Sequence, residues 1–192
     1  MKKKMIVFIM CSLLIGSLAG CGKKNNGNSG NTAEATVATS EELLTNVWET
    51  YEDSERFSAG GGDYENIVEN APGKVDVTKE EDLDSMLGLP ADSGVTVEDA
   101  ASLVHMMNAN LFTAGAFHVE NREEAETLAD SLRSNIVGRQ WICGFPDTLI
   151  VATVENEYVV SAFGDKEIIA TFKTKLFAEY PSAELIYEEE LE

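Results

Sequence analysis

Apolar residues recur at helical spacing in two places in the first half of the chain, and each place predicts a helix. The first helix is predicted over residues 41–53, with Thr39 and Glu42 as a capping box at its start. Its apolar face consists of Leu43, Leu44, Val47, Trp48 and Tyr51. A second capping box, residues 78–81, starts a short helix that Gly88 ends.

The pattern then changes to short runs rich in apolar residues, which predict two hairpins with a helix after each. Residues 101–107 and 111–119 are predicted to form the first hairpin. Asn121 caps the clearest helix of the chain, residues 122–137, and Gly138 stops it.

The second hairpin is predicted from residues 148–154 and 158–163, where β-branched and aromatic residues are dense. Asp165 caps a last helix, which ends before Pro181. Residues 183–187 have the pattern of a possible further edge strand.

This order of elements predicts the α+β class. Two N-terminal helices precede the order β-β-α-β-β-α, and strands that come as hairpins form a mainly antiparallel sheet. We expect the helices to cover one face of that sheet. Gly60-Gly61-Gly62 is interpreted as a loop. The phenylalanines expected to fill the core are Phe112, Phe117, Phe145, Phe163, Phe172 and Phe177.

The first twenty residues have the parts of a secretory signal. Residues 2–4 are lysines, and residues 5–18 form an apolar run shorter than the about 20 residues that span a bilayer. Small residues follow directly. The sequence therefore predicts export of the chain and removal of residues 1–20.

Leu18, Ala19 and Gly20 stand directly before Cys21. This motif resembles the lipobox of bacterial lipoproteins. The resemblance implies cleavage before Cys21, diacylglyceryl on its sulfur and acylation of its new amino group, which would anchor the protein on the extracytoplasmic face of the cell membrane. The other interpretation is an ordinary secretory signal followed by a chance cysteine.

Residues 22–39 are small and polar and offer almost nothing to bury, which predicts a flexible linker. We therefore divide the chain into a signal peptide (1–20), a lipidated cysteine with its linker (21–39) and a single α+β domain (40–192). A domain of that length has enough residues for one hydrophobic core.

The chain is strongly acidic, with 14 Lys and Arg against 34 Asp and Glu and a formal net charge of −20. Removal of residues 1–20 takes away three lysines, which leaves 11 Lys and Arg and a net charge of −23. Nucleic acid and anionic membrane are therefore poor partners for the domain. The charge is compatible with cations or basic partners, but solubility alone is the more common reason for such a charge.

Cys143 is the only thiol left in the exported domain, since Cys11 leaves with the signal and Cys21 carries lipid. The segment Trp141-Ile142-Cys143-Gly144-Phe145-Pro146 resembles the Trp-Cys-Gly-Pro-Cys motif of thioredoxin-like redox proteins. Pro146 stands where that chemistry requires a second thiol, so we expect a buried, apolar thiol instead.

His105 and His118 are the only histidines of the chain. We expect both near the end of the first hairpin that is far from its turn, where they and Glu120 could bind a transition metal. No His-Glu-x-x-His motif accompanies them. Ordinary strand histidines are the more common case, so we assign no metal and no cofactor.

Several short motifs lie between residues 80 and 178: Leu87-Gly88, Met106-Met107-Asn108, a strand ending at Val119, the capped helix after it, Pro146, and Tyr158-Val159-Val160 before the helix of Phe172. Together they resemble an uncharacterised domain family that is common in small lipoproteins of clostridia-type bacteria. The resemblance implies the fold and the membrane location, and it brings no activity with it.

The expected function is that of a membrane-anchored extracytoplasmic lipoprotein with a non-enzymatic domain that binds a ligand or a partner. Neither a Gly-x-Ser-x-Gly elbow nor a phosphate-binding loop is present in the sequence. The alternative is a thiol- or metal-dependent enzyme that uses Cys143 or the pair His105 and His118. A structural protein of the cell envelope is a third possibility.

Overall fold

The computed structural model describes residues 37–107, 110–142 and 144–191. Within them, the chain forms four helices and eight strands. Their bounds are α1 Ser40–Glu49, β1 Ala59–Gly62, β2 Ile67–Glu69, β3 Gly73–Val75, α2 Glu80–Leu87, β4 Asp99–His105, β5 Phe112–His118, α3 Arg122–Gly138, β6 Thr148–Val154, β7 Tyr158–Gly164, α4 Lys166–Glu179 and β8 Glu184–Glu190.

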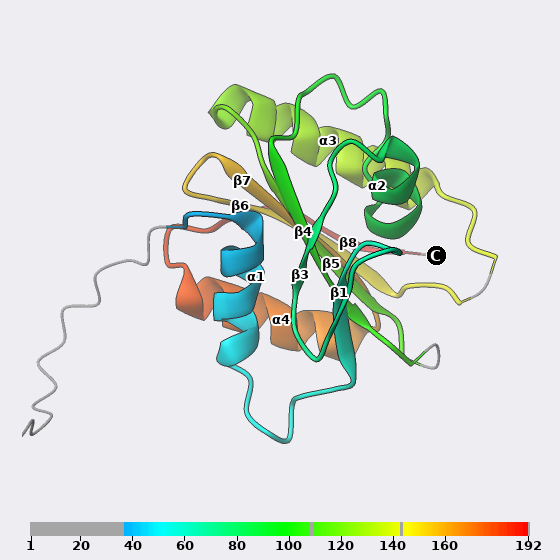
Figure 1. The fold of residues 1–192 in the computed structure, drawn as a ribbon, viewed down its shortest axis with the longest axis vertical. Helices are drawn as coiled ribbons and strands as arrows, with labels where there is room; N and C mark the ends of the chain where they lie inside the picture. Colours follow the sequence, from blue (N-terminus) through cyan, green and yellow to red (C-terminus); the bar gives the residue numbers. More distant parts are fainter. Residues whose placement is uncertain (1–36, 108–109, 143, 192) are drawn as a thin grey trace, which may run out of the picture. The chain divides into compact units, whose positions relative to one another are not determined.

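All eight strands belong to one antiparallel sheet, in the order β2-β1-β4-β5-β7-β6-β8, with β3 beside β4 (Figure 1). Both predicted hairpins are present, as β4–β5 and β6–β7. The possible edge strand is also present, as β8 along β6. The α+β class and the mainly antiparallel sheet are therefore confirmed.

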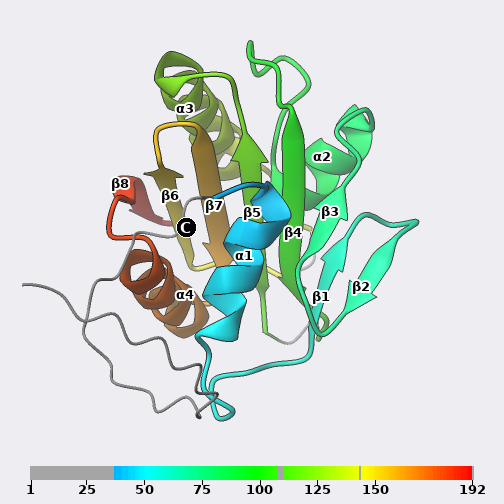
Figure 2. The same ribbon diagram turned by 60° about the vertical axis from the view of Figure 1, so that its left-hand side comes forward.

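The helices cover both faces of the sheet, so the expectation of one covered face is wrong. Helices α1 and α4 lie on one face, and α2 and α3 lie on the other (Figure 2). The cause is visible in β6 and β7, where every residue is buried. Ile150 packs toward α1 and α4 while its neighbour Val151 packs toward α3, and a strand buried on both sides needs helices on both sides.

Local capping signals in the sequence had mixed outcomes. The side chains of Thr39 and Asn121 each accept a hydrogen bond from the amide three residues on, at 3.1 Å, as predicted. Gly88 ends α2 with a left-handed φ of 76°. The capping box at Thr78 is wrong, because the Thr78 hydroxyl donates to Asp76 Oδ1 at 2.7 Å in the preceding turn.

The glycine run interpreted as a loop is strand β1, which pairs with β2 on one side and with β4 on the other. Three consecutive glycines have no hydrophobic period, so the sequence pattern could not distinguish a strand from a loop there. Residues 56–74 as a whole form β1, β2 and the start of β3, which build one end of the sheet.

The packed chain is already in place at Val37, earlier than the expected domain boundary at residue 40. The Val37 amide donates to Glu155 Oε2 at 3.3 Å, and the Tyr158 hydroxyl donates to the Val37 carbonyl at 3.4 Å. The predicted signal peptide and residues 21–36 of the predicted linker lie outside the described residues. No helix in the described part of the chain combines the length and the hydropathy needed to cross a membrane.

Candidate functional site

The predicted lipidation site falls where the structure describes nothing. Leu18, Ala19, Gly20 and Cys21 lie outside the described residues, and so does Cys143. Lipidation at Cys21 and the burial of the Cys143 thiol therefore both stay predictions.

The residues on either side of Cys143 differ from the core expectation. Ile142 is 92 % exposed and Phe145 is 66 % exposed, so the placement of Phe145 in the core is wrong. Gly144, with a φ of 80°, lies against the side chain of Leu111, where a β-carbon would come within 2.8 Å of Cδ1. The Leu111 side chain thus packs against the Gly144 backbone, while the Phe145 ring stays outside the core.

The two histidines do not meet, which corrects the expectation that they share one end of the hairpin. His118 pairs with Asp99, whereas His105 follows Val104, which pairs with Thr113. Six residues of β4 therefore separate their levels in the sheet, about 20 Å at the rise of a strand. An antiparallel register pairs residues at equal distances from the turn, so His105 lies at the turn end.

Each histidine has its own surroundings. His105 stacks on Phe57 with ring centroids 4.7 Å apart, and burial lowers its pKa against the opposing charge of Asp165. His118 Nδ1 lies 3.1 Å from Glu98 Oε2, and Nε2 lies 3.9 Å from Glu157 Oε2. Across the described ranges, His, Cys, Asp and Glu side chains form no group of three suited to a metal ion.

Most exposed apolar side chains come from three segments of the chain. Of nine large apolar side chains that are strongly exposed in the described chain, eight come from three segments: the β1–β2 hairpin, the end of β4, and the stretch from the end of α3 to residue 145. They are Tyr64, Ile67, Val68, Met106, Met107, Val137, Ile142 and Phe145. We call this set the α2-side surface, because α2 connects its segments.

Contacts with α2 tie the segments together. The Tyr64 hydroxyl lies 3.5 Å from Ser85 Oγ, which attaches the β1–β2 hairpin to α2. The Arg139 guanidinium donates to the Ser85 carbonyl at 3.3 Å and also binds the Asp84 carboxylate, which attaches the segment after α3. Arg139 in turn lies over the Trp141 ring, 5.6 Å from its centroid.

A cavity of about 170 Å³ opens within this surface. Its floor is β1, where glycine side chains are missing, together with Val104 of the neighbouring strand. Tyr64, Ile67 and Met106 are among its lining residues, and they are 61 %, 59 % and 49 % exposed. The lining residues are Gly60, Gly61, Gly62, Asp63, Tyr64, Ile67, Met86, Val104 and Met106.

Asp63 is the one charged residue of that lining, and its carboxylate is already engaged. It is 2 % exposed, and Oδ1 accepts the amides of Glu65 and Asn66, both at 2.9 Å. Burial raises the pKa of Asp63, but those hydrogen bonds and the Lys79 ammonium 3.8 Å away lower it more, so that the pKa lies below its usual value. The carboxylate therefore holds the hairpin turn in shape.

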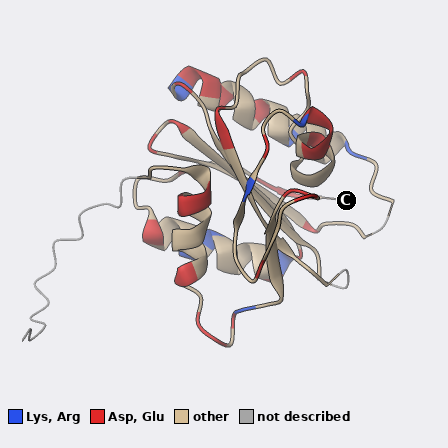
Figure 3. Ribbon diagram, viewed as in Figure 1, with Lys and Arg blue, Asp and Glu red and all other residues tan. Residues whose placement is uncertain are grey.

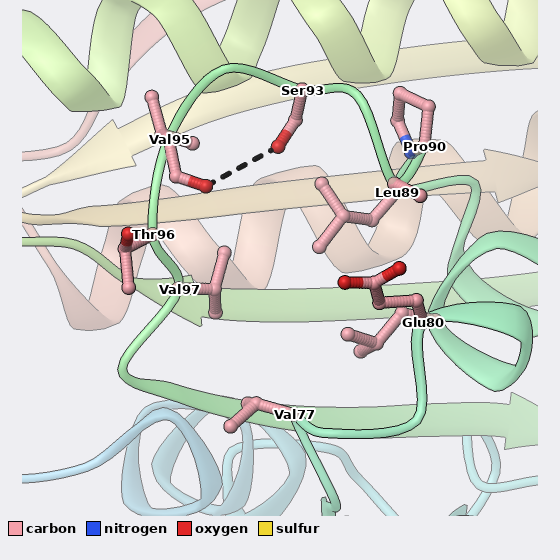
Figure 4. A pocket seen from close by; sticks show the side chains of 10 residues that line it. Val77, Glu80, Leu89, Pro90, Ser93, Val95, Thr96 and Val97 are labelled. Atoms are coloured by element: carbon pink, nitrogen blue, oxygen red, sulfur yellow. Dashed lines mark hydrogen bonds between the residues drawn. The ribbon is translucent and has the colours of Figure 1, made fainter.

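A second cavity of about 210 Å³ lies under the loop between α2 and β4 (Figure 4). Apolar side chains of the loop and of the residues near α2 surround it, and the Glu80 carboxylate points in among them (Figure 4). The Ser93 hydroxyl donates to the Val95 carbonyl at 3.4 Å, and Ser131 donates to the Ser93 carbonyl at 3.0 Å. The loop is thus hydrogen-bonded both to itself and to α3.

A wider hollow of about 370 Å³ lies on another side of Asp63 and has mainly polar and charged lining. Lys74 there pairs with Asp99 at 3.2 Å, and Asp76 is engaged by Thr78. The cavities of about 170 and 210 Å³ are smaller than the roughly 300–1,000 Å³ of typical small-molecule sites. They fit a single side chain of a partner better than a whole metabolite.

The α2-side surface was not predicted from the sequence. Its cavity depends on the glycine strand, which was interpreted as a loop, and Phe145 was placed in the core. A comparison of the chain with protein-family models, with curated proteins and with solved structures finds no match. The functional interpretation therefore depends on the sequence motifs and on this geometry.

Proposed function

We propose that this chain is a lipid-anchored extracytoplasmic lipoprotein whose domain binds a partner through the α2-side surface without catalysing a reaction. Eight of the nine exposed large apolar side chains come from segments that contact α2, and three of them, Tyr64, Ile67 and Met106, line one cavity, which carries the binding half of the proposal. Large contiguous apolar patches on soluble monomers often have a binding role.

The anchoring half depends on the lipobox at Leu18-Ala19-Gly20-Cys21. Two or more acyl chains on one cysteine hold a protein on a membrane where a single chain is marginal. The similarity of the motifs between residues 80 and 178 to an uncharacterised lipoprotein domain is consistent with the same location.

The direction in which the chain leaves the domain fits this arrangement. Val37 accepts a hydrogen bond from the hydroxyl of Tyr158, which pairs with His118 at one end of β5. Met106 and Met107 follow β4 at the opposite end of the same hairpin. A tether that arrives at Val37 leaves the Met106 end of the domain free to meet a partner.

Fractionation of cells tests the anchor. Wild-type protein is expected in the membrane fraction, resistant to salt and extracted by detergent, with the mass of a lipidated chain that begins at Cys21. The Cys21→Ser variant is expected to lose the lipid and to stay uncleaved or to be released. Lipid-free, processed wild-type protein would contradict the anchoring half.

Site-specific photocrosslinking tests the binding half in intact cells. A photoreactive residue at position 64, on the α2-side surface, is expected to give a discrete adduct that Ile67→Ser removes. The same residue at position 185 is the control, because Leu185 is the ninth exposed apolar side chain and lies on β8. Equal adducts from both positions, or an adduct that Ile67→Ser leaves unchanged, would contradict the assignment of the surface.

The competing proposal is an enzyme that depends on Cys143 or on the histidines. A site that uses His105 and His118 together is disfavoured by their positions at opposite ends of the hairpin. Cys143→Ser and the double variant His105→Ala, His118→Ala separate the two proposals. If either variant folds normally but fails to replace the wild-type protein in cells that lack it, the enzyme proposal is favoured.

A further inference from the structure

The α2-side surface carries charge of one sign around its apolar groups. Residues 59–69, which include β1 and β2, contain three acidic residues and no basic one. Helix α2 contains four acidic residues and no basic one, and Figure 3 shows it largely red. Glu69 pairs with Gly60 across the hairpin, and α2 contributes Met86 to the cavity lining, so both acidic elements lie next to the cavity.

The nearest cations already have partners. Lys79 Nζ lies 2.7 Å from Glu65 Oε2 and 3.8 Å from Asp63 Oδ2. Arg139 binds the Asp84 carboxylate and two carbonyls of α2. These ion pairs stabilise the walls of the surface and leave its acidic character in excess.

The two edges of the sheet differ in how they are protected. Four of the seven residues of β8 are glutamates, and each forms an ion pair with a Lys or Arg. Charged side chains of this kind discourage an edge strand from meeting another chain. The β2 edge instead presents two exposed apolar residues, Ile67 and Val68, and Ile67 lines the cavity.

Charge also decides between a membrane and a protein as the partner. Anionic lipid headgroups attract basic residues, and they repel a surface whose flanks are acidic. A protein segment with basic residues matches both the apolar cavity and its acidic flanks, and such complementarity raises association rates and specificity.

We propose that the glycine cavity receives one apolar side chain of a partner protein, from a segment that carries basic residues on either side of it. This inference rests on the proposed function and adds the class of partner. The apolar side chain enters the cavity above β1, between Ile67 and Met106, and the basic residues face Glu69 and the acidic residues of α2.

The test uses the full-length protein in phosphatidylcholine nanodiscs and two synthetic peptides, Lys-Lys-Gly-Leu-Gly-Lys-Lys and Glu-Glu-Gly-Leu-Gly-Glu-Glu. Binding is read by fluorescence anisotropy and by protection of Met106 from peroxide oxidation, followed by mass spectrometry. The lysine peptide is expected to protect Met106 and to bind at least about tenfold more tightly than the glutamate peptide, since several charge contacts act together.

Variants locate the binding. Gly60→Val fills the cavity, and a β-carbon there meets only the flexible Met106 side chain, 2.4 Å from its sulfur, so the fold can adapt. Ile67→Ser removes an exposed wall and keeps the test valid if Gly60→Val fails to fold. Each is expected to weaken lysine-peptide binding by about tenfold, as loss of a central contact does. Leu185→Ser on β8 is the matched control and should bind like wild type.

Charge reversal tests the acidic flank. Glu69→Lys is expected to weaken the lysine peptide by about two- to fivefold, the range of an exposed ion pair, and to strengthen the glutamate peptide. Glu49→Lys, an exposed reversal at the end of α1, is the matched control for net charge. Equal effects of the two reversals would overturn the local charge argument.

Three results would overturn the proposal. The first is a lysine peptide that leaves Met106 unprotected up to about 1 mM, the weak limit of specific recognition. The second is equal affinity for both peptides. The third is protection of Met106 by phosphatidylglycerol vesicles but by neither peptide, which would assign the surface to lipid. Each leaves the photocrosslinking result intact, so failure of this inference is distinguishable from failure of the proposed function.

Discussion

Gly61 of β1 lies so close to Gly73 of β3 that a β-carbon on Gly61 would come within 2.2 Å of the Gly73 nitrogen. The approach is backbone against backbone. Strand β1 pairs with β4 only at Ala59 and Gly60, and β3 then takes over the same side of β4 from Gly73 onward. Glycine at both positions lets one strand give way to the other, and the bare backbone also creates the floor of the cavity.

Gly61→Ala is therefore expected to lower the free energy of unfolding by at least about 1–3 kcal/mol, the cost of forcing atoms into a filled site. Backbone atoms cannot rotate away as a side chain does. Gly138→Ala is the control, because nothing lies within 4 Å of its β-carbon position, and alanine there should stabilise α3 by up to about 1 kcal/mol. Urea unfolding followed by circular dichroism measures both, and equal midpoints would show that the close approach of β1 and β3 does not require glycine at position 61.

Gly88 and Gly94 form a pair that separates backbone strain from packing. Both have a left-handed φ, 76° and 81°, so alanine costs each about 1–2 kcal/mol. A β-carbon on Gly88 would also lie 2.5 Å from Ile136 Cγ1, whereas the Gly94 position has open space. Gly88→Ala should therefore lower the free energy of unfolding by about 1–3 kcal/mol more than Gly94→Ala does, as measured by chemical unfolding. Identical losses of free energy of unfolding in the two variants would show that the Ile136 side chain moves aside without cost.

Trp48 holds the far end of the β1–β2 hairpin. Its indole N–H donates to the Asn70 carbonyl at 3.0 Å from a buried position on α1. Trp48→Phe keeps most of the packing and leaves that carbonyl without its donor, which should cost about 1–3 kcal/mol. Hydrogen exchange in residues 59–69 is expected to accelerate. Trp141→Phe, at a half-buried ring against Phe163, should leave exchange in the hairpin unchanged.

Asp63 makes the hairpin sensitive to acid. Its pKa in the folded protein lies below its ordinary value, because hydrogen bonds from Glu65, Asn66 and the charge of Lys79 outweigh the effect of burial. The stability that it contributes is present above the unfolded pKa of about 4 and is lost as the pH falls through the lower folded pKa.

Asp63→Asn is expected to lower the free energy of unfolding by about 1–3 kcal/mol at neutral pH, since an amide cannot replace a carboxylate that accepts several hydrogen bonds. It should also show a shallower fall in stability between pH 5 and pH 2 than wild type. Asp92→Asn, at an exposed carboxylate, serves as the control. The measurement is the unfolding midpoint of each protein across that pH range. If the midpoints of wild type and Asp63→Asn fall with pH at the same slope, Asp63 is not the source of the acid sensitivity.

Local signals in the sequence determined a large part of this protein. The two hairpins, the caps at Thr39 and Asn121 and the left-handed stop at Gly88 follow from interactions within one element or across one turn. The antiparallel α+β class follows from the order of those elements. The lipobox prediction is local in the same way, because it depends on a few consecutive residues.

Only the tertiary structure decided the rest. The division of the helices between two faces depends on the side of the sheet on which α3 packs against β6 and β7, and the strand at Gly60–Gly62 exists because β2 and β4 supply its hydrogen bonds. The separation of His105 from His118 is a matter of register. The α2-side surface joins side chains from three distant segments. Such features depend on which segments meet, and the period of a single segment contains no information about its neighbours in space.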